Sequence, residues 1–367
     1  MKTHRKPLVI AVATALGTLG TLPVQALQIT TSPVSFSNSA SVTDNEGGSS
    51  TSNNNASLGS SSLNQFDSTS GVLTGTTLSL TSTRTTTVTA LGSGTSSSKP
   101  ISKGTGSSAI SITGAPGVTY TPTSATVNSQ CTGTKAAGCS VPSTSTQVAN
   151  LAVDANDLNS YVGTSTLSIT GTATTLTAEQ TASVFPGAES TTHSISAKLS
   201  ATYTYLLHAA PSFNDLSSML TLDLDFGTVF LGDVADMDFS IYNLAPVTGS
   251  PIDRVGLDLD TFDPFPVPFS FNLSTFYGLA SGSNNIYTAS MNTSTLGEFK
   301  ATYHLYFSDE DVGASSSRFS YQDHPLMFQL TLNLSGRVEP IPVPEPGALT
   351  LLGIGLLGLP FARRRRR

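Results

Sequence analysis

The chain has 367 residues, 38% of them hydrophobic, which is enough for two domains with apolar cores. Only 11% of the residues are charged, and the body between residues 27 and 346 holds 9 basic residues and all 24 acidic ones. An acidic body repels anionic lipid and nucleic acid, so the composition argues against a nucleic-acid-binding protein. The 54 serines and 52 threonines are likewise untypical of a cytosolic enzyme and suit an exported surface protein.

Residues 1–26 have the pattern of a secretory signal peptide. Three basic residues precede an apolar stretch from residue 8 to residue 22, and small residues stand at both recognition positions before a cleavage site between Ala26 and Leu27. The alternative, a buried N-terminal helix, is disfavoured because two glycines and Pro23 would interrupt it. We therefore expect the secretion machinery and signal peptidase to act on this end.

Residues 27–208 are predicted to form a β-rich domain. Residues 199–205 alternate strictly, with Leu199, Ala201, Tyr203 and Tyr205 on one face and hydroxyl residues on the other. Similar, shorter patterns predict strands at 71–81, 108–113 and 165–170. One short helix is expected at 154–163, where an aspartate begins the segment and a glycine ends it.

Cys131 and Cys139 enclose seven residues of a glycine-, alanine- and lysine-containing loop. An exported protein meets an oxidising compartment, so a disulfide between them is the preferred interpretation. Two free thiols, or a reactive or metal-binding pair, are the alternatives, but no histidine lies nearby in the sequence.

Three short motifs in this half carry a resemblance to a known module. They are LNQFD at 63–67 followed by GVL at 71–73, YVGT at 161–164, and ATYTY at 201–205. Together they resemble the choice-of-anchor E domain, a β-rich extracellular unit with varied C-terminal anchors. In that family the last motif tends to precede the anchor, whereas here about 140 further residues intervene.

Residues 209–340 are predicted to form a second, differently built domain. This half is much richer in aromatic residues, with 21 between residues 201 and 340 against five between 27 and 200. Alternating patterns at 220–226, 299–307 and 328–334, with turns at Gly227, Gly232 and other glycines, favour an immunoglobulin-like β-sandwich. The predicted fold class is therefore all-β, with two β-sandwich-like domains.

Acidic doublets in the second half offer oxygen ligands of the kind that Ca²⁺ prefers. The doublets are Asp223/Asp225, Asp236/Asp238, Asp258/Asp260 and Asp309/Asp311. Neither an EF-hand loop nor a glycine-aspartate repeat is present, and solvated strand faces and turns explain the pairs more simply. We therefore expect no metal site and no cofactor.

No catalytic motif stands out. His193, His208, His304 and His324 are scattered without ligand spacing, and no residue is placed by a motif as the base for a nucleophile. We expect no enzymatic activity and no catalytic residue. Tyr277, Tyr287 and Tyr321, with the Phe- and Pro-rich stretch at 262–269, are candidates for contacting a sugar ring, although an interstrand loop packed on the core is the simpler interpretation of that stretch.

The last residues combine three features in a fixed order. A proline-rich segment at 341–346 contains Val343, Pro344, Glu345 and Pro346. An uncharged stretch at 347–362 would rise about 24 Å as a transmembrane helix. The basic cluster that follows consists of Arg363, Arg364, Arg365, Arg366 and Arg367. By the positive-inside rule the arginines stay cytoplasmic and the body lies outside.

These three features resemble the PEP-CTERM sorting signal of Gram-negative bacteria. The resemblance implies recognition and cleavage by an exosortase-like membrane protease, in organisms that make exopolysaccharide. It also implies an inner-membrane-anchored precursor that is later moved to the cell surface or the extracellular matrix. We therefore predict a structural protein of an exopolysaccharide or biofilm matrix, and as the alternative a polysaccharide-binding sandwich, with or without calcium.

Overall fold

The computed structural model describes residues 26–36, 40–44, 50–53, 55–92, 95, 97, 99, 101–134, 136–182, 188–247, 253–264, 267–342, 347 and 353. The predicted signal peptide up to residue 25, the segment 343–346 and the arginines at 363–367 lie outside the described residues, as does the predicted transmembrane helix except for two of its positions. Within the described ranges, none of the helices has the length and apolar character that crossing a membrane requires. The chain is mostly β-strand, as predicted.

The strands between residues 27 and 206 form two sheets that pack face to face. One sheet consists of β1 (Leu27–Thr30), β2 (Val34–Ser35), β3 (Ala40–Asp44), β6 (Val72–Ala90), β9 (Cys139–Ala152) and β11 (Glu189–Leu206). The other consists of β4 (Ser50–Ser52), β5 (Ala56–Asn64), β7 (Ile101–Thr113), β8 (Ala125–Thr132) and β10 (Thr166–Ala182). Their orders are β1-β11-β6-β9 and β4-β10-β7-β8, with β2 and β3 also paired to β11 and β5 to β10.

The central strands of this first sandwich are unusually long. β6 has 19 residues, β11 has 18 and β10 has 17, whereas strands of five or six residues are typical. A 19-residue strand spans about 60 Å, so the sandwich is elongated. The predicted strands at 71–81, 108–113 and 165–170 are thus parts of longer strands.

The apolar core of the first sandwich lies near the second one. Leu199, Ala201, Tyr203 and Tyr205 are all buried there, which confirms the predicted inward face of residues 199–205. The predicted helix at 154–163 is present as a 3₁₀ helix, η2 (Ala155–Tyr161). A second 3₁₀ helix, η1 (Ser68–Ser70), lies between β5 and β6.

The strands between residues 211 and 339 form a second sandwich. One sheet has the order β12-β14-β18-β16, where the strands are β12 (Pro211–Ser212), β14 (Asp236–Asn243), β18 (Asn284–Met291) and β16 (Phe269–Phe271). The other has the order β13-β20-β19-β15-β17, where they are β13 (Thr221–Phe230), β20 (Gln329–Glu339), β19 (Gly297–Asp309), β15 (Leu257–Phe262) and β17 (Phe276–Leu279). The 3₁₀ helix η3 (Ser315–Ser317) and helix α1 (Pro325–Phe328) lie between β19 and β20.

The predicted alternation of the second sandwich matches its core. Tyr303, Leu305 and Phe307 of β19 are buried against Leu330 and Leu332 of β20. Aromatic and leucine side chains make up most of this core.

Gly227 does not form the predicted turn. It lies inside β13 with a φ of 66°, at a shift in register between Asp225 and Thr228. The strand continues past this bulge to Phe230, and β13 pairs with β20 in parallel. The turn that was predicted at Gly232 is present, and φ there is 89°.

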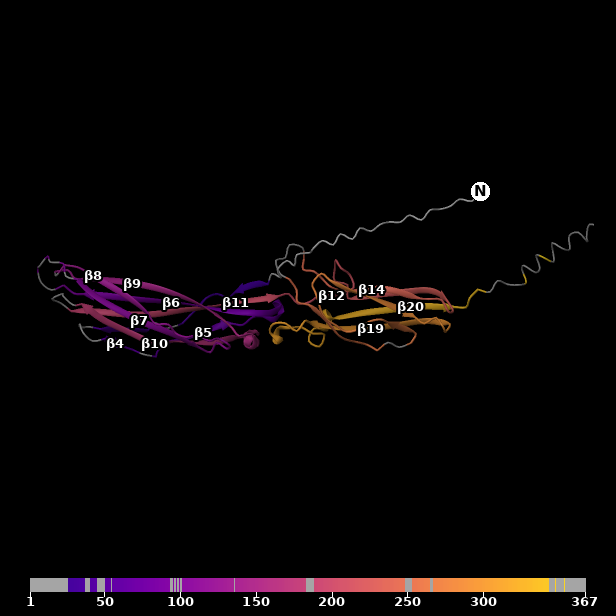
Figure 1. The fold of residues 1–367 in the computed structure, drawn as a ribbon, viewed down its shortest axis with the longest axis horizontal. Coiled ribbons are helices and arrows are strands. Elements are labelled where there is room, and N and C mark those ends of the chain that lie inside the picture. The colour runs from indigo at the N-terminus through magenta and orange to yellow at the C-terminus, as the bar shows by residue number, and fades with distance from the viewer. Residues whose placement is uncertain are drawn as a thin grey trace, which may run out of the picture.

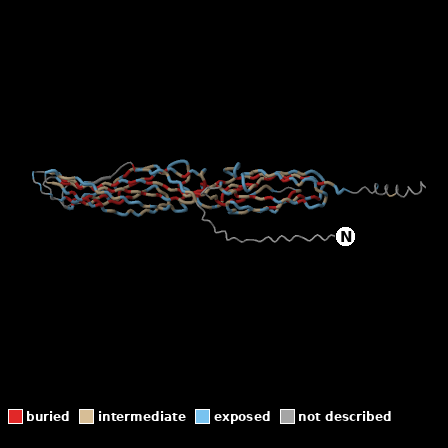
Figure 2. The backbone as a smooth tube through the Cα atoms, turned by 90° about the horizontal axis from the view of Figure 1, so that it is seen from above, coloured by how far each residue is buried: buried red, intermediate tan, exposed pale blue. Residues whose placement is uncertain are grey.

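The two sandwiches lie end to end and form a rod (Figure 1). Figure 2 shows buried residues along the axis of both halves and exposed residues around the outside. β11 ends at the junction, and β20 ends at the opposite end of the second sandwich.

Candidate functional site

The chain leaves the second sandwich at the end farthest from the first one (Figure 1). β20 ends there at Glu339, which pairs with Phe230 of β13. The amide of Leu231 donates to the carbonyl oxygen of Glu339 at 2.9 Å, so the last residue of the strand is held on its β13 side. Residues 340–342 therefore lead from a paired central strand directly toward the predicted sorting motif at 343–346.

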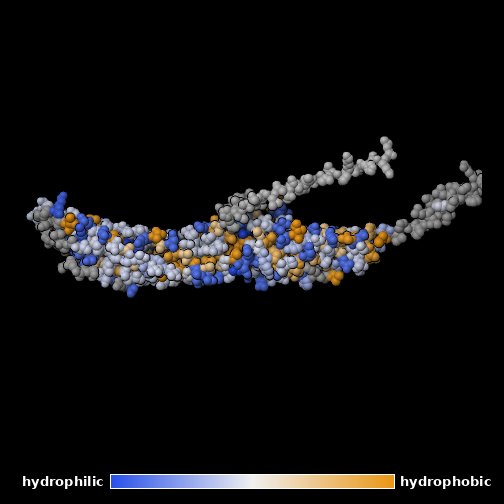
Figure 3. Space-filling view, in the orientation of Figure 1, coloured by the Kyte–Doolittle hydropathy of each residue, from blue (hydrophilic) through white to orange (hydrophobic). Residues whose placement is uncertain are grey.

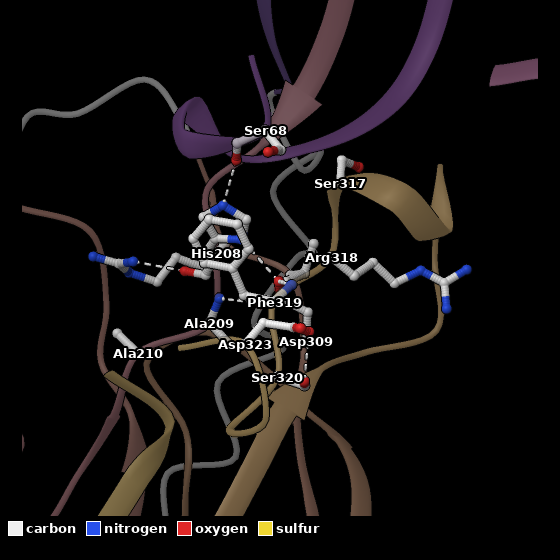
Figure 4. A network of polar contacts seen from close by, with 12 residues as sticks. Ser68, His208, Ala209, Ala210, Asp309, Ser317, Arg318, Phe319, Ser320 and Asp323 are labelled. Atoms are coloured by element: carbon white, nitrogen blue, oxygen red, sulfur yellow. Dashed lines mark hydrogen bonds and ion pairs between the residues drawn. The ribbon is translucent and has the colours of Figure 1, made fainter. Parts of the chain in front are cut away.

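A buried histidine joins the two sandwiches at their junction. Figure 4 shows His208, just after β11, with Ser68 of η1 on one side and Asp309 of β19 on the other. The ring Nδ1 lies 2.7 Å from Asp309 Oδ2, and Nε2 lies 2.8 Å from the carbonyl oxygen of Ser68. One imidazole ring thus connects the first sandwich to the second.

Both oxygens around the His208 ring are acceptors. Asp309 also accepts the backbone amides of Ala209 at 2.8 Å and Phe319 at 2.7 Å. A backbone carbonyl such as that of Ser68 only accepts. Each ring nitrogen of His208 therefore already has a hydrogen-bond partner, and neither nitrogen is left to act as a general base.

Packing holds the His208 ring in place. It stacks on Phe319 with ring centroids 3.7 Å apart, and Phe319 stacks in turn on His324 at 3.5 Å. Arg254 donates through Nη1 to the carbonyl oxygen of His208 at 2.7 Å, and burial lowers the pKa of this guanidinium. The junction is consequently a packed interface and not a flexible linker.

A second set of contacts fixes the same junction. Leu73 of β6 donates to Ser317 Oγ at 2.9 Å and accepts the amide of Ala314 at 2.8 Å. On η2, Asn159 Oδ1 accepts the amide of Ser316 at 3.0 Å. The loop between β19 and β20 thereby bonds to the end of the first sandwich at two further positions, Leu73 and Asn159.

The far half of the first sandwich has a polar interior. Thr86 Oγ1 donates to the carbonyl oxygen of Val127 at 3.0 Å, so it accepts from His193 Nδ1, 2.8 Å away. His193 Nε2 is then the acceptor for Ser108 Oγ at 3.0 Å. Burial, followed by the nearby charge of Arg84, lowers the pKa of His193 to about 4, in agreement with this neutral tautomer.

Arg84 itself is fully buried between the sheets. Its Nε donates to the carbonyl oxygen of Ser108 at 3.1 Å, and Nη1 donates to Ser82 Oγ at 2.9 Å. Further along, Glu189 Oε2 accepts from Ser102 Oγ at 2.6 Å and from Gln180 Nε2 at 3.2 Å. These hydrogen bonds give the buried polar side chains partners, so the polar interior stabilises the fold.

The predicted disulfide is present between Cys131 and Cys139, whose Cα atoms are 5.9 Å apart. Cys131 lies in β8 and Cys139 begins β9, so the bond connects edge strands of opposite sheets. Val88 and Ala90 pack around it and form a small apolar cluster at the far end of the sandwich.

The acidic doublets behave differently from one another. Asp223 and Asp225 share the exposed face of β13, where they accept from Asn333 and Ser335 at 2.8 and 3.0 Å. Within the described part of the chain, no group of three or more His, Cys, Asp or Glu side chains is placed to hold a metal ion.

In two doublets one of the two aspartates is buried, contrary to expectation. Asp309 is 2% exposed because it serves the junction, and Asp258 is 6% exposed because it accepts the amide of Gly278. Burial raises the pKa of Asp258, and the neighbouring charges of Asp260 and Glu310 raise it further.

A shallow polar groove crosses the exposed face of β13, β20 and β19. One part has a volume of about 480 Å³ and is lined by Asp223, Thr302 and Asn333 among others. The adjoining part, of about 410 Å³, includes Asp225 and Arg337, and Lys300 lines both. Carboxylate, amide, hydroxyl and ammonium groups thus lie side by side on an open surface.

The candidate aromatic residues do not form one platform. Tyr287 is buried in the core, Tyr277 is 75% exposed on the edge strand β17, and Tyr321 packs against Tyr306 with ring centroids 4.8 Å apart. The predicted loop at 262–269 connects β15 to β16 and begins the latter with the buried Phe269.

His304 is also paired with a carboxylate. Its Nδ1 lies 2.9 Å from Asp263 Oδ2, on the surface beside Tyr306, whose hydroxyl donates to Asp263 Oδ1 at 3.2 Å. Neither this pair nor the pair of His208 and Asp309 was expected, since each joins residues far apart in the sequence.

At the predicted cleavage site, Leu27 is the first residue of β1 and pairs with Tyr205. Ala26 immediately precedes this strand. A cut between the two would leave the ordered sandwich intact.

No curated protein matches the chain. Among 13 matching chains of solved structures is one titled "Structure of Vibrio cholerae VesB protease", with 14% identity and a TM-score of 0.23, covering 38% of this chain and 37% of that chain. The chain thus spans well under half the length of that protein, and so low a score carries no argument about fold or activity.

A family model of the PEP-CTERM protein-sorting motif matches residues 342–367. The match includes all of the residues from Val343 to Pro346 and the five arginines. The resemblance of residues 27–208 to the choice-of-anchor E domain is not confirmed and stays a prediction. The chain carries a PEP-CTERM sorting motif directly after its last strand, and such a motif implies a secreted protein that exosortase sorts to the cell surface.

Proposed function

We propose that this protein is a structural component of the extracellular matrix of a Gram-negative bacterium that makes exopolysaccharide. The observation that carries the proposal is the sorting motif at 342–367, which follows strand β20 of an elongated body. The precursor is held in the inner membrane by residues 347–362, and exosortase then cuts it near 343–346. The body is released to the surface or the matrix, where it has a structural role that depends on its elongated shape.

The fold supports such a role. The second sandwich is proposed to be immunoglobulin-like, because its sheets β12-β14-β18-β16 and β17-β15-β19-β20-β13 follow the ABED and CFG arrangement with added edge strands. The order of two edge strands departs from the immunoglobulin arrangement. β16, which pairs with β18, comes before β17 in the sequence. The first sandwich is proposed to be a choice-of-anchor E-like domain.

A non-enzymatic role is part of the proposal. Both ring nitrogens of His208 are occupied, and His193 is buried among hydroxyl groups. A base that activates a nucleophile needs an unoccupied nitrogen within reach of that nucleophile. His304 is more exposed than His193 and His208, and its Nδ1 bonds to Asp263.

The sorting proposal is tested in the native host by intact mass and membrane fractionation. The wild type is compared with a variant that combines Pro344→Ala, Glu345→Ala and Pro346→Ala. We expect the wild type to lose about 26 N-terminal and about 20 C-terminal residues and to leave the inner membrane, whereas the variant keeps its C-terminal segment and stays there. If both keep that segment in the membrane fraction, the sorting proposal fails.

The polar groove favours a second candidate function, the binding of polysaccharide. Asp223, Asn333 and Thr302 form a hydrogen-bonded row across three strands, with Lys300 between the two parts of the groove. Paired acceptors and donors of this kind match the vicinal hydroxyl groups of sugars.

A glycan array with and without chelator tests this second function. Selective binding that is lost in Asp223→Ala but kept in Asp236→Ala, an exposed aspartate on the opposite sheet, would support the groove. Loss of binding on adding chelator would indicate calcium assistance. A purely structural component shows no selective binding in either condition.

A further inference from the structure

The end of the second sandwich from which the sorting segment leaves is built by three loops that bond to one another. Gly232 donates its amide to the carbonyl oxygen of Thr293 at 3.2 Å, and Thr293 Oγ1 donates to that of Asp233 at 2.6 Å. The amide of Asn292 donates to the carbonyl oxygen of Pro268 at 2.8 Å. Residues 231–235 between β13 and β14, 267–268 before β16 and 292–296 between β18 and β19 are therefore joined by hydrogen bonds into one surface, which we call the exit surface.

Large apolar side chains project from the exit surface. Val267 is 85% exposed, Val234 84%, Ile341 60%, Leu296 50% and Phe230 39%. Figure 3 shows apolar residues at this end of the rod, beside the point where the chain leaves. Single exposed apolar residues are ordinary, but here every one of these loops and the departing segment supplies one.

The exit surface also carries little charge. Asp233 is the one charged residue in the described segments 231–235, 267–268, 292–296 and 340–342. The remainder of the body has a large excess of acidic residues, which repels anionic surfaces. The loops of this end therefore add little charge of their own where they would meet a lipid headgroup layer.

The sequence limits how far the exit surface can lie from the membrane. Five Cα steps separate Pro342 from Gly347, the first residue of the uncharged stretch, so the gap is at most about 18 Å. Prolines at 340, 342, 344 and 346 restrict the conformations of this connection.

We propose that the exit surface rests on the lipid headgroup layer while the precursor is anchored, with Val234, Leu296 and Val267 inserted at the interface. The contact sets the rod upright and holds 343–346 at a fixed height above the bilayer, where a membrane protease can reach it. This proposal rests on the proposed anchoring by residues 347–362. It adds a lipid-binding surface on the folded body.

The absence of tryptophan from the chain provides a direct test. The precursor from residue 27 to residue 367 is reconstituted into phosphatidylcholine vesicles with one introduced tryptophan, Val234→Trp or Leu296→Trp. The control is Leu326→Trp on α1, because Leu326 is 87% exposed and lies at the opposite end of the same sandwich. All three positions are exposed, so the substitutions do not disturb the core.

Tryptophan emission and its quenching by lipids brominated near the headgroup are then measured. The two exit-surface variants should show blue-shifted emission and strong quenching, whereas Leu326→Trp should show neither. Flotation of the same vesicles reports anchoring separately. Chains that float without quenching at Val234 and Leu296 overturn the lipid contact and leave the anchoring intact, while chains that fail to float overturn both.

Discussion

At the scale of single residues, the most unusual feature is a histidine inside a hydroxyl-lined core. His193 is fully buried, and its neighbours Thr86 and Ser108 fix one neutral tautomer. Glycine makes the space: a Cβ atom at Gly106 would lie 2.1 Å from His193 Nδ1. The ring and the missing side chain therefore form a matched pair on facing strands.

Acid should destabilise the first sandwich through His193. Its pKa is about 4 in the folded state against about 6.5 when unfolded, so the unfolded chain binds more protons between these values. The free energy of unfolding is therefore highest with respect to His193 above pH 6.5. It falls by up to about 3 kcal/mol as the pH is lowered toward 4. Urea denaturation between pH 4.5 and 7.5 measures it.

The variant His193→Gln isolates this contribution from that of the carboxylates. Its free energy of unfolding should depend less steeply on pH than that of the wild type, even if it is lower at pH 7. Equal slopes for the two proteins would contradict the role of His193.

At the scale of elements, Gly106→Ala should destabilise β7. The added methyl group must displace the His193 ring or the facing strand, which costs about 1 to 3 kcal/mol. Gly75→Ala in β6 is the control, because its Cβ would lie 3.6 Å from the nearest atom. The control Gly75→Ala should leave stability in thermal unfolding unchanged or slightly higher. Equal losses of stability in the two variants would contradict the packing argument.

The sequence predicted strands wherever the inner face is apolar. Leu78 and Leu80 mark the first part of β6, but the next inward side chains are Ser82, Arg84 and Thr86. Alternation of apolar and polar residues cannot distinguish these inward side chains from the hydroxyl residues of the outer face. The predicted strand therefore ended at residue 81, nine residues before the end of β6.

The candidate site was predicted unevenly for a related reason. The sorting motif and the disulfide are local patterns, and both were found from the sequence. His208 and Asp309 are 101 residues apart, and only the meeting of two sandwiches brings them together. A local sequence pattern cannot indicate a contact between residues so far apart in the chain.

At the scale of the whole molecule, the straightness of the rod should depend on His208. His208→Phe keeps the stacking on Phe319 but leaves Asp309 buried without its ring partner, which costs about 1 to 3 kcal/mol. We expect small-angle scattering to report a broader range of end-to-end distances. His304→Phe, which removes a surface pair on β19, should leave the scattering unchanged; the same broadening in both variants would contradict a specific joint.

The parallel pairing of β13 with β20 has a mechanical consequence. Tension applied through residue 342 acts along the axis of β20, whose hydrogen bonds to β13 and β19 run across that axis. The bonds are then strained together and not one after another, so resistance to pulling is shared along the strand. A surface protein tethered by this end would withstand drag from flowing liquid or from a contracting polymer network before its second sandwich opened.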